Sequence, residues 1–232
     1  MNIALKNIDR AEVLRYLGQG QGTVDELVAA QLLAAEEVVL TLARPRAVYR
    51  LFDLAREGET LSLLGTALTL LGRDIRTHLA TADRCLLFAA TLGAAVDQEI
   101  LRVQTRDMAL AAVMDATASA AIEQVCALVQ HELTALAASV EGHLTDRFSP
   151  GYGDMPLEQQ RAFCTVLDGE KIGLGVTDHF LLTPRKSVTA ILGLCPRPLP
   201  LAEDRSSVCT LCHSTDTCNF RKAGAPCGKP LS

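Results

Sequence analysis

The sequence predicts an α+β domain with a small sheet and several long helices. Residues 94–140 contain no proline, and their apolar residues recur at helical spacing. Residues 84–92 instead form a short apolar run that ends before Gly93, which is typical of a buried strand. Alanine and leucine are abundant and tryptophan is absent, a composition that favours helices packed through small residues.

Residues 8–42 predict two helices. Asp9 is a candidate N-cap for the first helix, whose apolar stripe begins at Val13. Thr23 is a candidate N-cap for the second helix, and Glu26 follows three residues later, as in a capping box. No strand is expected before residue 43.

Three elements are expected in the next part of the chain. Residues 47–54 are rich in β-branched and aromatic residues and predict a strand. Residues 68–80 predict a helix, and residues 84–92 predict the buried strand described above.

The proline-free segment predicts two long helices with a break near residues 105–107. In the second helix, Asp115, Ser119 and Glu123 are spaced four residues apart and therefore lie along one face. Three polar residues on one face of an otherwise apolar helix are candidates for contacts with a site.

A loop at residues 145–156 separates the long helices from the last predicted elements. A helix is expected over residues 157–167, because Pro156 occupies a helix-start position. Residues 180–194 predict two strands or one bent strand, with a turn at residues 184–186.

Charge and composition exclude several classes of protein. The net charge of −5 and the pI near 5.6 do not provide the basic face that nucleic-acid binding requires. No stretch reaches about 18 uncharged apolar residues, so we expect no membrane span. The N-terminus has no cleavage signature of a secreted protein. A cytoplasmic protein without a nucleic-acid or membrane partner is therefore expected.

The eight cysteines fall into two groups. Four are scattered in apolar surroundings and are expected to be small buried hydrophobes: Cys85, Cys126, Cys164 and Cys195. The other four form a cluster with a Cys-x-x-Cys pair, which in a cytoplasmic chain suggests metal: Cys209, Cys212, Cys218 and Cys227. The spacing suits structural zinc or an iron–sulfur cluster equally, and a tail without any ligand also remains open.

The loop that begins at Arg147 has the most informative local sequence, Arg-Phe-Ser-Pro-Gly-Tyr-Gly-Asp. Arg147 offers a planar donor fork that suits a carboxylate or phosphate. Pro150 fixes its own φ, and Gly151 allows a positive φ, so backbone amides of this loop can approach a ligand closely. Tyr152 adds an aromatic face and a hydroxyl. The same residues also suit a plain helix-to-helix turn.

The Arg-x-x-Pro-Gly-Tyr pattern resembles the S-adenosylmethionine-binding loop of the activation domain of cobalamin-dependent methionine synthase. Downstream, Thr177-Asp178 resembles the Thr-Glu of that family, and Pro184 with Ser187-Val188-Thr189-Ala190 resembles its Pro and Ser-Val-Ser-Gly. Order and spacing match over roughly residues 85–193.

The resemblance implies a C-shaped activation-domain fold with a twisted antiparallel sheet and long helices. We expect the chain to divide into an N-terminal helical segment (1–60) that is part of the main domain, a core that binds S-adenosylmethionine (61–194) and a cysteine-rich tail (195–232) that lies outside the family pattern.

The resemblance also implies roles for individual residues. Arg147 would bind the carboxylate of the methionine moiety, and Tyr152 would bond to or stack on the ligand. Ser149, where the family pattern has alanine, and Gly151 would offer backbone contacts. Ser119 stands where the family has a glutamate, so Glu123 one turn later is the candidate for that acidic role. Asp178 is the second acidic candidate.

Nothing in the sequence resembles the homocysteine, folate or cobalamin-binding modules, and no Asp-x-His-x-x-Gly cobalamin loop occurs. The resemblance therefore implies an activation subunit that docks on a separate cobalamin-dependent methionine synthase and supports reductive methylation of its cob(II)alamin. A flavodoxin or ferredoxin is the expected electron donor. Whether the chain is itself an enzyme stays open. The alternatives are a reactivation factor for another corrinoid methyltransferase and a metal-binding interaction protein with a non-functional groove.

Overall fold

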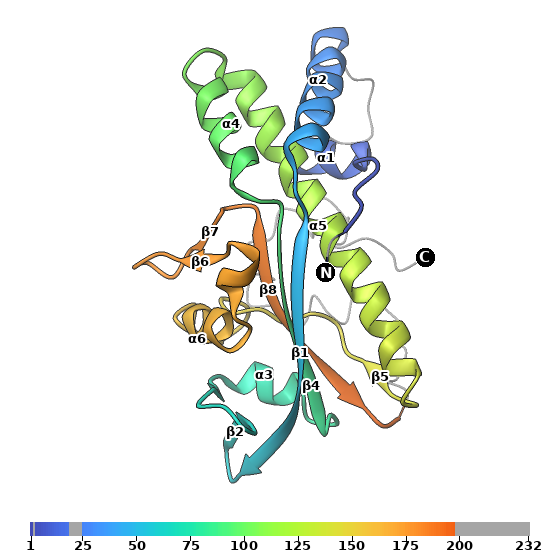
Figure 1. Cartoon of the computed structure of the whole chain (residues 1–232), viewed down its shortest axis with the longest axis vertical. Helices are drawn as coiled ribbons and strands as arrows, with labels where there is room; N and C mark the ends of the chain where they lie inside the picture. The colour runs from blue at the N-terminus through green and yellow to red at the C-terminus, as the bar shows by residue number, and fades with distance from the viewer. Residues whose placement is uncertain (2, 19–24, 198–232) are drawn as a thin grey trace.

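The computed structural model describes residues 1, 3–18 and 25–197. Its centre is a six-stranded antiparallel sheet (Figure 1). In spatial order the strands are β3 (Thr69–Leu70), β2 (Thr60–Leu63), β1 (Arg46–Glu57), β4 (Arg84–Thr91), β8 (Ser187–Cys195) and β5 (His143–Leu144). A separate pair consists of β6 (Gly175–Val176) and β7 (Leu182–Thr183).

Helices cover both faces of the sheet. They are α1 (Arg10–Tyr16), α2 (Glu26–Leu42), α3 (Arg73–His78), α4 (Ala94–Gln104), α5 (Met108–Ala138) and α6 (Gln159–Val166), with a 3₁₀ turn η1 (Gly169–Ile172). Helices α1, α2 and α4 contact α5, whereas α6 and η1 lie on the opposite side of the sheet from α5 (Figure 1).

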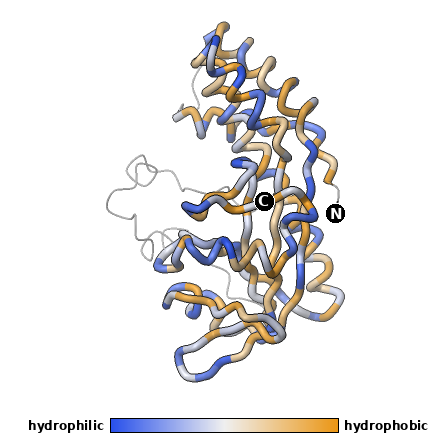
Figure 2. The backbone as a smooth tube through the Cα atoms, turned by 60° about the vertical axis from the view of Figure 1, so that its left-hand side comes forward, coloured by the Kyte–Doolittle hydropathy of each residue, from blue (hydrophilic) through white to orange (hydrophobic). Residues whose placement is uncertain are grey.

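Both faces of the sheet are apolar. Successive side chains of a strand point to opposite faces, and consecutive residues of β4 are apolar and buried. In β4, Leu86 and Phe88 join the core under α5, while Cys85 and Leu87 join the core under α3 and α6. Figure 2 shows hydrophobic colouring in both the helical part and the sheet. A strand that is buried on both sides reads as a continuous apolar run, which is why the sequence predicted β4 correctly.

Helix α5 is 31 residues long, which corresponds to about 46 Å. Many of its buried residues are alanines, for example Ala118 and Ala121, and small side chains let neighbouring elements approach closely. By length and composition the helix is apolar enough to cross a membrane, but 61% of its most apolar window is buried in the fold. This burial is what the core helix of a folded domain shows.

The predicted class, α+β with an antiparallel sheet and long helices, is confirmed. The break between α4 and α5 lies where the sequence predicted it, and Asp9 caps α1 by accepting hydrogen bonds from two backbone N–H groups. Asp25 caps α2, while Thr23, the predicted cap, lies outside the described residues. The C-shaped outline and the domain boundaries stay predictions.

The helix predicted over residues 68–80 is wrong in its first part. Leu68 and Leu70 are buried in the core under α3 and α6, and residues 69–70 pair with β2 as a strand. Gly72 then adopts a φ of +117°, and only Arg73–His78 is helical. The sequence analysis also missed β2, β5 and β6, which are too short to show a periodicity.

The four scattered cysteines are buried and unpaired, as predicted. Burial raises the pKa of Cys85 and Cys126 to about 12 and that of Cys164 to about 11, so these thiols stay protonated at neutral pH. The four clustered cysteines predicted as metal ligands, residues 209, 212, 218 and 227, lie outside the described residues. Within the described part, no group of three His, Cys, Asp or Glu side chains is arranged to hold a metal ion.

Candidate functional site

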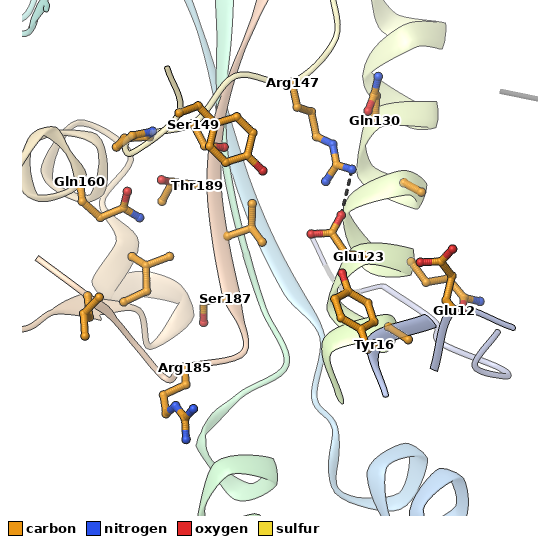
Figure 3. Close-up of a pocket in the computed structure, with 18 of the residues that line it drawn as sticks. Glu12, Tyr16, Glu123, Gln130, Arg147, Ser149, Gln160, Arg185, Ser187 and Thr189 are labelled. Atoms are coloured by element: carbon orange, nitrogen blue, oxygen red, sulfur yellow. Dashed lines mark hydrogen bonds and ion pairs between the residues drawn. The ribbon is translucent and has the colours of Figure 1, made fainter. Parts of the chain in front are cut away.

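An open pocket of about 1020 Å³ lies between α5 and the start of β8. Five segments line it: helix α1 with the residue before it, the middle of α5, the loop that follows β5, the start of α6, and residues 180–189 around β7 and β8. Figure 3 shows Glu123 and Arg147 on one side of this pocket, with Ser187 and Thr189 of β8 on the other.

The Pro-Gly corner of the loop is a tight turn. The backbone N–H of Tyr152 donates to the carbonyl of Ser149 (3.0 Å), and Gly151 between them has a φ of +90°. A proline followed by a residue with positive φ is the signature of a type II turn. The sequence indicated that Gly151 allows a positive φ, and the structure has this conformation there. Ser149 and Tyr152 both line the pocket.

A backbone bridge ties the loop to the sheet. Phe148 and Ile191 of β8 exchange two hydrogen bonds, at 2.9 and 2.8 Å. The Phe148 ring contacts the rings of His78 (5.2 Å between centroids) and Tyr152 (6.0 Å). His78 Nε2 lies 2.9 Å from Thr145 Oγ1, and burial lowers the pKa of this histidine, which favours the neutral imidazole. Phe148, the residue that follows Arg147, is therefore held in place by the sheet and by the two neighbouring rings.

Arg147 and Glu123 form an ion pair in the wall of the pocket. The Arg147 Nη2 atom lies 3.0 Å from Glu123 Oε2, and the arginine side chain is only 27% exposed. Burial acts to lower the pKa of Arg147, but Cys126 and Glu123 beside it outweigh this effect and leave the pKa raised. A permanent cation and a carboxylate side by side can bind the two charged groups of a zwitterionic amino acid.

Two further polar residues on α5 hold β8 in place. The Nζ atom of Lys186 donates to Asp115 Oδ1 and to Ser119 Oγ, both at 2.9 Å, and Lys186 is 8% exposed. Asp115, Ser119 and Glu123 thus face the same side of α5, as their spacing predicted. Ser119, at the position where the resembled family has glutamate, contacts a buried lysine instead.

Asp178 is not brought to the pocket. Its carboxylate is fully exposed and lies 3.8 Å from Arg161, whereas the residues that line the pocket nearby are Phe180, Leu181 and Leu182. Gly151 shapes the loop without lining the pocket itself. Of the six predicted site residues, the structure brings Glu123, Arg147, Ser149 and Tyr152 together around one cavity.

Sequence reasoning missed the contribution of α1. Glu12, Arg15 and Tyr16 line the pocket more than 100 residues before Glu123 in the chain. The Arg15 guanidinium lies 4.7 Å from the centroid of the Tyr16 ring and pairs with Glu12 at 2.8 Å. No local motif marks these residues as part of a site. It also missed Lys186 and Gln160, of which Gln160 lines the pocket from α6.

No family model matches the sequence, and no curated protein sequence matches it. Among solved structures, the chain is similar to the MetH reactivation domain, whose crystal structure was determined with AdoHcy bound. The TM-score is 0.59 at 18% sequence identity, and the match covers 94% of this chain and 82% of that one. The resemblance inferred from the loop sequence is therefore confirmed at the level of the fold.

The carboxylate of Asp154 at the end of the loop should be needed for stability at neutral pH. It accepts hydrogen bonds from the backbone N–H groups of Arg73 (2.7 Å) and Asp74 (2.9 Å), and these bonds lower its pKa. Because the folded-state pKa is lowered, the stabilisation is present above the ordinary value near 3.8 and is lost as the pH falls through the folded-state pKa.

We therefore expect Asp154→Ala to melt at a lower temperature than the wild type at pH 7, with a difference that shrinks below about pH 4. Thermal unfolding followed by circular dichroism between pH 3 and pH 8 measures this. Asp178→Ala, which removes an exposed carboxylate elsewhere, should melt like the wild type. Equal melting temperatures of Asp154→Ala and wild type at pH 7 would contradict the prediction.

Proposed function

We propose that the pocket binds S-adenosylmethionine and S-adenosylhomocysteine, with the amino-acid part of the ligand held by Arg147 and Glu123. The observation that carries this proposal is the ion pair of these two residues in the wall of the pocket. The likeness to a reactivation domain solved with AdoHcy supports it.

In this proposal, ligand binding breaks the ion pair between Arg147 and Glu123, and each of the two residues forms a new ion pair with the ligand. The guanidinium of Arg147 turns its fork to the ligand carboxylate, and Glu123 accepts from the ligand ammonium group. Partly exposed ion pairs contribute only about 0–1 kcal/mol. The exchange favours binding because Arg147 makes one hydrogen bond to Glu123, whereas its fork can make two to the ligand carboxylate while Glu123 gains the ligand ammonium, and hydrogen bonds to charged groups contribute about 1.5–3 kcal/mol each. Ser149 lines the pocket and offers backbone groups, Gly151 shapes the loop that holds it, and Tyr152, which is largely exposed, covers the ligand from the loop side.

The second part of the proposal concerns the role of the bound ligand. The chain would act as an activation subunit for a cobalamin-dependent methionine synthase, with the cobalamin carried by that partner. The cobalt and the sulfonium group supply the chemistry, in which one-electron reduction of cob(II)alamin is coupled to methyl transfer. The chain itself supplies binding and orientation. A different corrinoid methyltransferase as partner and a groove that no longer binds any ligand are the two alternatives.

The clustered cysteines complete the proposal. Four cysteines between residues 209 and 227 would bind zinc or an iron–sulfur cluster, and a cluster could pass an electron from a flavodoxin or ferredoxin to the corrinoid. Asp178 stays a candidate for contact with ligand or partner. Free thiolates are maintained in reducing compartments, so we propose that the protein acts in the cytoplasm.

Arg147→Ala should weaken the binding of S-adenosylhomocysteine by at least about tenfold, because it removes a charged contact of about 1.5–3 kcal/mol. Isothermal titration calorimetry of the purified chain measures this. Arg102→Ala removes an exposed arginine on α4 and should bind like the wild type. Glu123→Gln should also bind more weakly. Absence of binding to the wild type, both alone and with a cobalamin-loaded synthase present, would overturn the proposal.

The proposed partnership predicts that the wild-type chain restores methylcobalamin on a cob(II)alamin-loaded methionine synthase whose own activation domain has been removed. The reaction contains S-adenosylmethionine and reduced flavodoxin, and the visible spectrum of the cobalamin reports the product. Arg147→Ala should be slowed at limiting S-adenosylmethionine, and Arg102→Ala should not. Restoration on a different corrinoid protein alone would favour the first alternative, while no restoration on either protein argues against the role.

The cysteine cluster predicts one bound metal site per chain after anaerobic purification. Elemental analysis and acid-labile sulfide distinguish zinc from an iron–sulfur cluster. The double variant Cys209→Ser/Cys212→Ser should lose the metal. Cys164→Ala, which removes a buried thiol of the core, should retain it. A wild-type preparation with neither zinc nor iron would show that the cluster holds no metal.

A further inference from the structure

Within residues 25–197, strand β8 has an edge that no strand pairs with where it borders the pocket. One side of the strand pairs with β4 over its whole described length. The other side pairs with β5 only at Leu194 and Cys195, and Phe148 closes it at Ile191. Among the strands of the described residues, none pairs with the four residues before Ile191 on that side, and three of these four, residues 187–189, line the pocket. An unpaired strand edge presents N–H and C=O groups that are available for a ligand.

The direction of these backbone groups follows from the ladder. In an antiparallel strand, alternate residues direct both their N–H and their C=O to the same side. The carbonyl of Lys186 accepts from Leu92 after β4, so even-numbered residues bond toward β4. Ile191 bonds outward to Phe148, so Ser187 and Thr189 also direct their backbone groups outward. Within the described residues, neither the Ser187 carbonyl nor the Thr189 N–H has a partner.

The side chain of Thr189 adds a third polar group. Thr189 is 2% exposed, and its Oγ1 atom has no hydrogen-bond partner among the residues that the structure describes. Buried hydroxyl groups are nearly always bonded, since leaving one unsatisfied costs about 1–3 kcal/mol. Since Thr189 also lines the pocket, its hydroxyl is suited to bond with an occupant of the pocket.

We propose that this edge of β8 recognises the adenine ring of the ligand. The Ser187 carbonyl accepts from the N6 amino group, the Thr189 N–H donates to N1, and Thr189 Oγ1 bonds to a further polar atom of the nucleoside. Adenine presents a donor beside an acceptor on this edge of the ring. A carbonyl and the N–H two residues later on the same strand edge offer the complementary pair. The proposal rests on the proposed function, because it assigns the second half of the same ligand.

The short length of the free edge favours a base over a peptide strand. An added strand is held by several successive pairs of main-chain hydrogen bonds, but Phe148 closes this edge at Ile191 and leaves little more than one pair. Ser187 and Thr189 lie on the opposite side of the pocket from Glu123 and Arg147 (Figure 3). A ligand with a zwitterion at one end and a purine at the other can therefore contact the charged side chains on the α5 side and the backbone groups on the β8 side.

The edge is also held rigidly before any ligand arrives. The buried ammonium group of Lys186 fixes the residue before Ser187 to α5, and Ser187 Oγ donates to Thr91 Oγ1 at 2.8 Å. Fixed recognition groups reduce the ordering that binding requires. Such an edge discriminates strongly against a ligand with the wrong donor and acceptor.

The first test compares 5′-methylthioadenosine with 5′-methylthioinosine by calorimetry on the full chain. Inosine carries an acceptor in place of the N6 donor and a donor at N1, so both proposed bonds become repulsive. The inosine compound should bind at least about a hundredfold more weakly, and a 7-deaza analogue of 5′-methylthioadenosine should bind like the parent. Equal binding of the adenine and inosine compounds, or no binding of 5′-methylthioadenosine at millimolar concentration, overturns the proposal.

Neither compound carries the amino-acid group, so this comparison does not depend on Arg147 and Glu123. Binding of S-adenosylhomocysteine that requires Arg147, without discrimination between the two nucleosides, would leave the proposed function standing and remove only the adenine assignment. Discrimination between the nucleosides without any dependence on Arg147 would do the reverse.

The second test addresses Thr189 itself. Thr189→Val keeps the shape of the side chain and removes the hydroxyl, so binding of 5′-methylthioadenosine should weaken about three- to tenfold. Thr117→Val, which removes a buried hydroxyl within α5, is the matched control and should bind like the wild type. In amide hydrogen exchange followed by NMR, the ligand should slow exchange of the Thr189 N–H. Exchange at Thr189 that is unchanged at saturation would overturn the assignment.

Discussion

The packing of α5 against one face of the sheet determines where every part of the pocket lies. Buried alanines bring the helix close to β4 and β8, so side chains that project from the same face meet the elements beside it. Glu123 meets the loop at Arg147, and one to two turns earlier Asp115 and Ser119 meet Lys186. A single helix thus fixes both the charged wall of the pocket and the position of the strand opposite.

In the proposed complex, the two walls of the pocket would recognise the ligand by different means. On the α5 side, side-chain charges provide strong contacts that a point substitution can remove. On the β8 side, most of the proposed contacts come from backbone groups, which substitutions do not change. The loop connects the two, since Arg147 belongs to the charged wall while Phe148, the next residue, bonds to β8. A shift of this loop would therefore alter both walls together.

Local patterns predicted the features that depend on local interactions. The periodicity of residues 94–140, the apolar run of β4 and the positive φ of Gly151 all follow from neighbouring residues, and the structure has each of them. The features that were missed depend on distant parts of the chain. Tyr16 reaches the pocket only because α1 packs on α5, and the proposed role of Thr189 follows from a strand edge that no other described strand pairs with. The short strand β3 was taken for helix because two residues carry no period.

The pairing of β4 with β8 also has a consequence for how the chain folds. Ala89 and Thr189 lie opposite each other but are a hundred positions apart in the chain. Contacts between residues so distant in sequence close a large loop and form slowly. During synthesis, β4 emerges long before β8. Until β8 is made, one backbone edge of β4 is unpaired and its apolar side chains are partly uncovered, and chaperones protect nascent chains in this state. The pocket, which β8 lines, is thus among the last parts of the molecule to form.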